Sequence, residues 1–346
     1  NISYKKIEKL KSEEPTIIID FLVENGLWPF IKQRPYDVIA NPISNPKEIF
    51  ISGFDSSPLS ADFDFITKDE KESISKAISI LSKLCSKPIN ISLRKESQSF
   101  LRELNDVIIH NVSGPHPSGN LSTIINKVCP INKGDIIWTL NLPDLIIIGK
   151  ALLEGKFLAE RLIALAGSSV SKPKYIKTLI GSNISSFLKL NEKNSRVISG
   201  NVLTGTNLGS VAHLRYYSNE ITAIPEGDDY DLFGWAKPMF DKFSVSRALT
   251  FSWLSPNKKY DLNTNTNGEH RAFVVTGSFE EVFPLDIYPM QILKACMYKD
   301  LDEMEALGMY EVSPEDFALT EFICVSKQPH QNIIREGLDL MKKEIG

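Results

Sequence analysis

The sequence predicts a multi-domain α/β protein, and three observations lead to that prediction. The chain has 346 residues, which is too long for one ordinary hydrophobic core. Strand-like and helix-like segments alternate up to about residue 155, and strands crowd together after that point. Beyond Pro284 the pattern becomes helical. We therefore expect an α/β domain over residues 1–155, a second sheet with extra strands over 156–260 and a mainly helical domain over 261–346.

The chain opens with a predicted helix. Pro15 suits its first turn and Asn25-Gly26 is a typical end, because proline is tolerated at the first helical position and glycine just after the last. Helical spacing gives this segment one apolar face, made of Ile17, Ile18, Phe21 and Leu22. A turn at Arg34-Pro-Tyr36 then leads to the segment 37–40.

Short apolar segments farther along are predicted strands, at residues 48–53, 89–93, 106–110 and 136–140. Four helices are predicted among these strands. The first covers 67–85 behind a Thr67 cap, and the second ends at Leu104. The third follows the glycine-bearing loop that ends at Gly119, and the fourth covers 143–153. This alternation is typical of a mainly parallel sheet with covering helices.

The second domain has a different pattern. Strands are predicted at 161–166 and 172–181, then a short helix at 185–190, then strands at 196–199 and 202–204. This order suggests a small β-grasp unit. Further strand-like segments lie at 220–224 and 244–253.

An exposed loop at 262–269 precedes the helical domain and is the best candidate for proteolysis. Helices are predicted at 289–297, 300–307, 313–321 and 331–345. The third of these opens with Ser313-Pro-Glu-Asp316, which supplies a cap, a first-turn proline and two acids near the positive end of the helix.

Charge and hydropathy exclude two classes of function. There are 39 basic and 43 acidic residues, a net charge of −4, so neither a nucleic-acid surface nor a polybasic membrane anchor is expected. The longest apolar runs, at 145–148 and 16–23, are far shorter than the roughly 20 residues of a membrane span. If the protein serves a membrane, a partner must recruit it.

Cysteine and histidine spacing argues against a metal site. The cysteines form no CxxC pair and are expected to be reduced core thiols of a cytoplasmic protein; they are Cys85, Cys129, Cys296 and Cys324. The histidines are never spaced at i, i+4 in the manner of zinc helices; they are His110, His116, His213, His270 and His330. No Gly-x-Ser-x-Gly elbow is present, so catalytic residues are not assigned.

One loop stands out as a candidate binding site, because it follows a predicted strand at the place where open α/β sheets bind ligands. Its candidate residues are Ser113, Gly114, Pro115, His116, Pro117 and Gly119. The prolines stiffen the loop, the glycines permit close approach, and His116 is able to donate a hydrogen bond. The loop is interpreted either as a site for a quinone headgroup or a partner subunit, or as a tight structural turn whose His116 caps the next helix. Loop chemistry alone favours the turn.

Asp55 also follows a predicted strand and could face the same crevice, where its carboxylate would repel a nucleotide phosphate. Alternatively, the Asp55 side chain caps a turn or a helix. The Gly205–Gly209 segment lacks the end of a P-loop and is expected to be a turn. A series of aromatic residues is expected in the core of the second domain rather than in an exposed patch that binds a partner. The series comprises Tyr230, Phe233, Trp235, Phe240 and Phe243.

Several longer motifs resemble one family across nearly the whole chain. They include Gly26-Leu-Trp-Pro29, Phe54-Asp-Ser-Ser-Pro-Leu-Ser-Ala61, the 113–119 loop, Leu232-Phe-Gly-Trp235 and Pro284-Leu-Asp-Ile-Tyr-Pro289. The sequence resembles the A-subunit of the bacterial Na⁺-translocating NADH:quinone reductase. That family normally has a biotinyl-lipoyl-like domain ahead of this point, and the chain begins at Asn1 without methionine, so we expect a leading domain to be missing.

The family is in turn distantly similar to the flavin-bearing subunit of respiratory complex I. That similarity implies a Rossmann-like domain, a ubiquitin-like β-grasp domain and a C-terminal helical domain. In complex I an Arg- and Gly-rich run holds the flavin, whereas the corresponding segment here, 26–34, carries bulky residues. Clustered cysteines hold an iron–sulfur cluster there, and only Cys296 and Cys324 lie in that region here. We expect that this chain binds neither cofactor.

The resemblance implies a subunit on the cytoplasmic face of the bacterial inner membrane, held by membrane and peripheral partner subunits. It would support ubiquinone reduction coupled to Na⁺ export, with NADH and ubiquinone as substrates of the whole complex and with quinone as a possible ligand. A free-standing flavin- or nucleotide-binding oxidoreductase is one alternative, and a non-catalytic β-grasp binding module is another.

Overall fold

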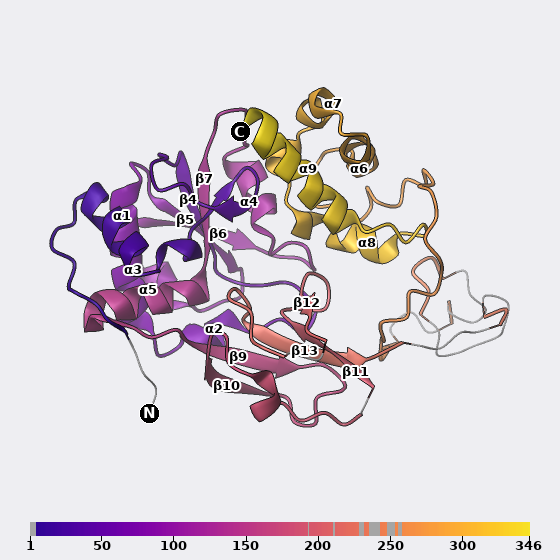
Figure 1. The fold of residues 1–346 in the computed structure, drawn as a ribbon, viewed down its shortest axis with the longest axis horizontal. Coiled ribbons are helices and arrows are strands. Elements are labelled where there is room, and N and C mark those ends of the chain that lie inside the picture. The colour runs from indigo at the N-terminus through magenta and orange to yellow at the C-terminus, as the bar shows by residue number, and fades with distance from the viewer. Residues whose placement is uncertain are drawn as a thin grey trace.

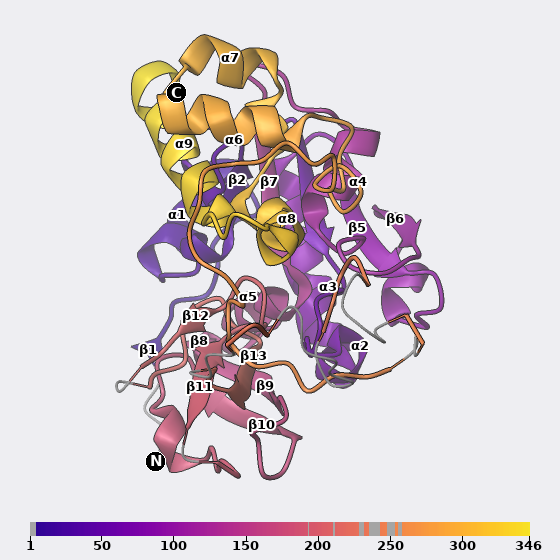
Figure 2. The ribbon, with the colours of Figure 1, turned by 90° about the vertical axis from the view of Figure 1, so that its right-hand side faces the viewer.

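The computed structural model describes residues 5–192, 194–209, 212–227, 232–234, 243–247, 253–254 and 258–346. It is a mixed α/β structure with two main sheets and a C-terminal helical region (Figure 1). The larger sheet lies in the first half of the chain, the smaller sheet packs beside it, and the helices of the last third sit against the larger sheet (Figures 1 and 2).

The larger sheet has six strands in the order β3-β2-β7-β4-β5-β6. Their bounds are β2 Lys32–Arg34, β3 Val38–Ile39, β4 Glu48–Ser52, β5 Ile89–Arg94, β6 Val107–Val112 and β7 Ile137–Asn141. The predicted mainly parallel sheet is confirmed, because β7, β4, β5 and β6 run parallel. An antiparallel hairpin of β2 and β3 extends it beyond β7.

Alternate side chains of β4 enter two different cores, as the two-residue period of a strand requires. Ile49 and Ile51 pack into one cluster with α1 Pro15–Glu24, α3 Lys71–Leu81 and α5 Leu142–Glu154. Phe50 points to the other face of the sheet and packs into a second cluster.

The second cluster joins the sheet to helix α4 Leu121–Val128 and to the helices of the C-terminal region. Those helices are α6 Pro289–Tyr298, α7 Leu301–Ala306, α8 Ala318–Ile323 and α9 His330–Ile345. Phe50 and Ile137 of the sheet share this core with Phe317 and Leu338. The C-terminal helices therefore cover one face of the larger sheet, and Figure 2 shows α6 and α9 stacked above it.

The smaller sheet has five strands in the order β10-β9-β13-β11-β12 and a separate small core. Their bounds are β9 Glu160–Ala166, β10 Lys174–Leu179, β11 Ser195–Ser199, β12 Thr206–Asn207 and β13 Glu220–Pro225. Strand β13 runs parallel to β9, and the other neighbours are antiparallel. A two-stranded ribbon of β1 Lys5–Lys6 and β8 Lys156–Phe157 precedes it.

Buried charges tie the two sheets together. Asp144 on α5 accepts a hydrogen bond of 2.6 Å from Arg161 on β9, and both side chains are almost fully buried, at 1% and 2% exposed. Arg161 also donates to Asn219 at 2.5 Å. A buried ion pair of this kind fixes the geometry between the elements that carry it.

Helices α3 and α5 pack in unusually close contact at Gly149. A Cβ added at this position would lie 1.9 Å from the backbone oxygen of Ser73 and 2.4 Å from the carbonyl carbon. Only glycine fits there, because the obstacle is main chain rather than a movable side chain.

Two predicted helices are wrong in their extent. Thr67 does not cap a helix over 67–85: it ends α2 Phe63–Thr67, which Asp62 caps, and α3 begins only at Lys71. The stretch before Leu104 forms only the short 3₁₀ turn Phe100–Glu103.

In the smaller sheet, the predicted helix at 185–190 is reduced to the 3₁₀ turn Ile184–Ser186. The predicted strand at 202–204 is a turn, because the Asn201 side chain accepts hydrogen bonds from the backbone N–H groups of Leu203 and Thr204. A side chain that binds the neighbouring backbone in this way competes with strand pairing.

The aromatic series is only partly described. Phe233 and Phe243 are 64% and 39% exposed, so the predicted burial in the core is wrong for both, and Phe243 instead contacts Tyr260 and Phe322. Tyr230, Trp235 and Phe240 lie outside the described residues, as do residues 248–252 of the strand-like segment 244–253. The 262–269 loop is largely exposed and forms neither helix nor strand, as predicted.

The four cysteines are free; Cys129, Cys296 and Cys324 are buried and Cys85 is half-buried. Predicted core thiols are thereby confirmed for three of the four. Within the described ranges, no group of three or more histidine, cysteine or acidic residues is placed to hold a metal ion. In the same ranges no helix has the length and apolar character that crossing a membrane requires.

Candidate functional site

A cleft of about 590 Å³ lies where the two sheets and the C-terminal region meet. Ser52 at the end of β4 and Asn141 at the end of β7 both line it. The cleft therefore lies at the carboxyl edge of the parallel strands, where open α/β sheets bind their ligands. Its volume is within the range of about 300–1,000 Å³ that is usual for small-molecule sites.

The predicted loop forms part of this cleft. His116 and Gly119 line it, and Asp55 faces it from the loop after β4, so the structure brings these three predicted residues together. Ser113, Gly114, Pro115 and Pro117 belong to the same loop but are not among the lining residues. The peptide bond between His116 and Pro117 is cis, and Gly114 has a φ of 120°.

Ser56 holds the two loops together. Its hydroxyl accepts a hydrogen bond of 2.8 Å from the Gly119 backbone N–H and lies 3.0 Å from Nδ1 of His116. A Cβ on Gly119 would come within 2.8 Å of the Ser56 backbone nitrogen, so this close approach needs glycine. The alternative in which His116 caps the next helix is wrong, since α4 begins after Asn120.

His116 is a neutral polar group in the cleft wall. Burial lowers its pKa below the usual value, against the opposing effect of Asp55 and Asp316. Its Nε2 is buried and has no hydrogen-bond partner among the described residues. Asp55 caps its own turn, because one carboxylate oxygen accepts from the Ser57 N–H at 2.7 Å.

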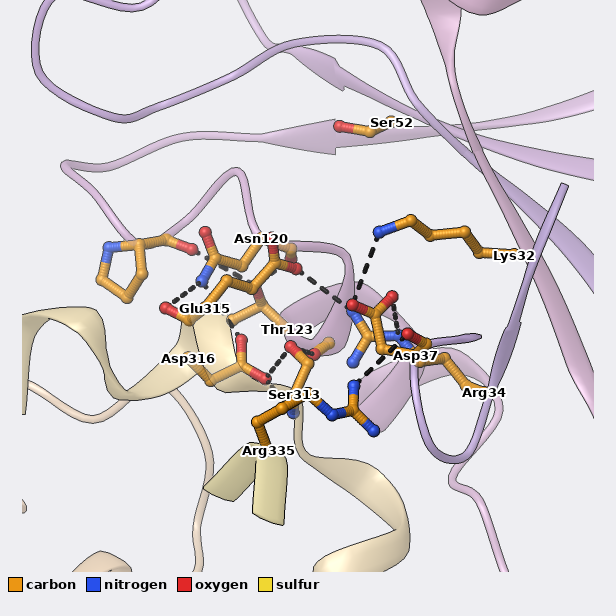
Figure 3. A network of polar contacts seen from close by, with 12 residues as sticks. Lys32, Arg34, Asp37, Ser52, Asn120, Thr123, Ser313, Glu315, Asp316 and Arg335 are labelled. Atoms are coloured by element: carbon orange, nitrogen blue, oxygen red, sulfur yellow. Dashed lines mark hydrogen bonds and ion pairs between the residues drawn. The ribbon is translucent and has the colours of Figure 1, made fainter. Parts of the chain in front are cut away.

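A polar network that the sequence analysis missed adjoins the cleft (Figure 3), and Lys32, Asp37, Asn120 and Glu315 of this network line it. Arg34 is buried and donates to Glu315 at 3.1 Å, and its Nε lies 3.7 Å from Asp37. Lys32 lies 3.5 Å from the other oxygen of Asp37. Burial alone would raise the pKa of Asp37, but Arg34 and Lys32 outweigh burial and hold the pKa below its usual value.

The network continues into the C-terminal region. The Asn120 amide donates to Asp316 at 3.1 Å, and Asp316 accepts 2.8 Å hydrogen bonds from both the backbone and the hydroxyl of Ser313. The predicted capping role of Ser313 is thereby confirmed. Desolvation and the negative charges of Asp316 and Asp37 raise the pKa of Glu315, against the attraction of Arg34.

Aromatic rings provide the apolar part of the wall. Tyr216 stacks on Phe30, with ring centroids 4.9 Å apart, and Tyr217 meets Tyr216 edge to face at the same distance. The Lys32 ammonium lies 4.8 Å from the centroid of Tyr217. Flat apolar faces beside fixed hydrogen-bonding groups are typical of a site for a planar, weakly polar ligand.

Glu220 also lines the cleft, at the start of β13, and is only 4% exposed. Burial, reinforced by Asp55, raises its pKa to about 7; the Ala61 N–H and Arg161 act in the opposite direction. A signal for this residue was present in the sequence, because a charged side chain opens an otherwise apolar strand. No short-range pattern connects it with Arg34 or Glu315.

Three side chains of the segment 26–34, for which the resemblance predicts the loss of a flavin site, are packed in the interior. Trp28, Phe30 and Ile31 are between 0% and 4% exposed and belong to the main core. The Trp28 indole donates to the Ala40 carbonyl at 2.7 Å. Side chains therefore fill the space around this backbone.

Two family models match the chain. The model described as the NqrA second alpha/beta domain covers residues 14–157, and the model described as the NQRA C-terminal domain covers residues 162–209. One solved structure, of an NAD⁺-reducing [NiFe]-hydrogenase in the air-oxidized state, aligns with a TM-score of 0.44 at 13% identity. It covers 61% of this chain, and this chain spans 47% of the hydrogenase chain.

Curated relatives named as the A-subunit of Na(+)-translocating NADH-quinone reductase match over most of their length. The protein of Neisseria meningitidis serogroup B is 35% identical over 93% of this chain and 73% of its own. Those of Haemophilus influenzae and a Marinomonas species are each 33% identical, over 99% and 97% of this chain and 76% of theirs. The chain therefore belongs to the A-subunit family of the Na⁺-translocating NADH-quinone reductases and is one of the subunits of that complex.

Proposed function

We propose that this subunit binds the headgroup of ubiquinone in the cleft between its sheets and thereby supports quinone reduction coupled to Na⁺ export. The observation that carries this proposal is the cleft itself, which combines the aromatic rings of Tyr216 and Tyr217 with His116 at the carboxyl edge of a parallel sheet. A quinone ring is planar and has two carbonyl oxygens, so it needs flat apolar contact and hydrogen-bond donors.

The finer architecture is part of the same proposal. The α/β domain over 1–155 is Rossmann-like, the smaller sheet over 156–260 is a ubiquitin-like β-grasp domain with extra strands, and residues 261–346 form the helical domain. Support comes from the parallel strand order of the larger sheet and from the separate small core of the other. In this arrangement the cleft is an interdomain site.

The subunit carries no redox centre of its own in this proposal. The segment that would hold a flavin in complex I is occupied here by the buried side chains of Trp28, Phe30 and Ile31. NADH and the electron carriers are then handled by partner subunits. The partners include membrane and peripheral subunits that hold this chain at the cytoplasmic face of the inner membrane.

Exposed apolar side chains of the C-terminal region supply part of the docking surface. Tyr298 is 84% exposed, Tyr288 63% and Val325 62%. Large apolar side chains that gather on a protein surface mark interaction sites. None of these three residues is among those that line the cleft.

A titration with a short-chain ubiquinone analogue tests the proposal. The purified chain is expected to bind the analogue saturably, and His116→Ala is expected to weaken binding about tenfold through loss of one hydrogen bond of roughly 1.4 kcal/mol. His213→Ala serves as the matched control, because His213 is not among the residues that line the cleft. Equal affinities of wild type and His116→Ala would remove this loop from the quinone site. Stoichiometric flavin absorbance in the purified chain would contradict the absence of a redox centre.

A further inference from the structure

Glu220 is a buried acid with too few partners for a charged group. One of its carboxyl oxygens accepts a single hydrogen bond, of 3.2 Å, from the backbone N–H of Ala61. No cation within the described residues lies within ion-pair distance of it, although the side chain is almost fully enclosed. An isolated carboxylate costs several kcal/mol to bury, so such a group keeps its proton instead.

The other buried acids of the described residues are all better provided for. Glu48 accepts from Lys87 and Asn90, Asp144 accepts from Arg161, and Asp316 accepts three hydrogen bonds. Each of these therefore has the donors that a carboxylate needs. Glu220 differs from them both in its single donor and in its place on the wall of the cleft.

The charges around Glu220 favour the protonated form. Asp55, on the facing loop, adds negative charge and raises the pKa of Glu220, whereas Arg161 on β9 only partly offsets burial. Arg215 also lines the cleft. His116 stays neutral above its lowered pKa, so Glu220 and Glu315 are the acids of the cleft that change charge near neutral pH.

We propose that Glu220 is a ligand-binding residue of the cleft, which holds a proton and donates it in a hydrogen bond to a carbonyl oxygen of the bound quinone. This inference rests on the proposed quinone site and adds the donor that the site uses. An acceptor-only ligand cannot bind a carboxylate, because both groups accept hydrogen bonds. Quinone affinity is therefore highest at low pH and falls as Glu220 ionises.

The test follows the binding of ubiquinone-1 to the full chain between pH 6 and pH 8.5. Wild type is expected to lose about thirtyfold in affinity over this range, because the protonated fraction of an acid with a pKa of about 7 falls by that factor. Glu220→Gln keeps an N–H donor of the same shape, so its affinity is expected to stay near the wild-type value at pH 6 and to change much less with pH than that of wild type. Any contribution of Glu315 is common to both proteins and cancels in the comparison. Glu48→Gln removes another buried carboxyl outside the cleft and is expected to follow wild type.

Infrared difference spectra between pH 6 and pH 8.5 report on the proton directly. Wild type is expected to show a carboxylic acid carbonyl band at pH 6 that diminishes as the pH rises, and this part of the band is expected to be missing in Glu220→Gln. Identical spectra for the two proteins, or identical pH profiles of saturable binding, overturn the inference and leave the quinone site standing. Failure of wild type to bind ubiquinone-1 at pH 6 overturns the quinone site and the donor role together.

Discussion

The contact between α3 and α5 at Gly149 gives a prediction whose sign depends on two opposing terms. In Gly149→Ala the new methyl group would start 1.9 Å from the Ser73 backbone oxygen, so the helices must separate by about 1.5 Å to reach ordinary contact at 3.4 Å. Such overpacking costs about 3 kcal/mol when the obstacle is backbone. Alanine recovers about 1 kcal/mol of helix propensity over glycine. The net expectation is a loss of about 2 kcal/mol in the free energy of unfolding.

Urea unfolding followed by circular dichroism measures this loss as a lower transition midpoint at an unchanged slope. Gly268→Ala is the matched control, because its new methyl group meets only the flexible end of Lys327, at 3.2 Å. That variant is expected to stay within about 0.5 kcal/mol of wild type. If Gly149→Ala proved as stable as wild type or more stable, the helices would be free to separate without cost and the reasoning would be refuted.

Three further predictions concern buried charge and exposed chain. Arg161→Met leaves the Asp144 carboxylate buried without its cation, so urea unfolding should show a loss of about 3–5 kcal/mol in the free energy of unfolding. Adding Asp144→Leu should restore most of this loss. A double variant as unstable as Arg161→Met would contradict this account. Burial lowers the pKa of His330 to about 4, so the unfolded chain takes up this proton below its usual pKa of 6.5 while the native chain does not. The contribution of neutral His330 to the free energy of unfolding is therefore fully present above pH 6.5 and falls by about 3 kcal/mol toward pH 4. Urea unfolding of wild type and His330→Gln at both pH values measures this loss, which should be smaller in the variant. Limited digestion with an endoprotease specific for glutamate should cut first after Glu269, because this residue is exposed in a loop without helix or strand. Mass spectrometry of the early fragments identifies the first cut, and a first cut elsewhere would contradict the prediction.

The parallel sheet was predictable because each of its central strands is a short apolar run between turn residues, as in Ile89–Arg94. The edge hairpin of β2 and β3 was not, since strands of three and two residues are too short to show a period. Thr67 was misread as a cap because one apolar helical pattern runs on through the break between α2 and α3. Only the Asp62 side chain, which accepts hydrogen bonds from the first turn of α2, fixes where that helix begins.

The candidate site was also only partly predictable from the sequence. The loop around His116 was predictable because its glycines, prolines and histidine are adjacent in the sequence. The polar network beside the cleft was not, because Arg34 meets Glu315 across 281 positions of chain and no local pattern records that meeting. Glu315 and Asp316 were both interpreted as helix-opening acids. Both lie in the first turn, as predicted, and Glu315 in addition pairs with Arg34.

The shared core beneath the C-terminal helices has a consequence for synthesis of the protein on the ribosome. Phe50 and Ile137 emerge early, yet the residues that shield them, such as Phe317 and Leu338, are translated near the end. During that interval the nascent sheet presents an apolar face to water, a state prone to aggregate and suited to chaperone binding. Truncation ahead of Pro289 makes that transient exposure permanent, so nonsense mutations late in the coding sequence should deplete the whole protein rather than release a shortened one.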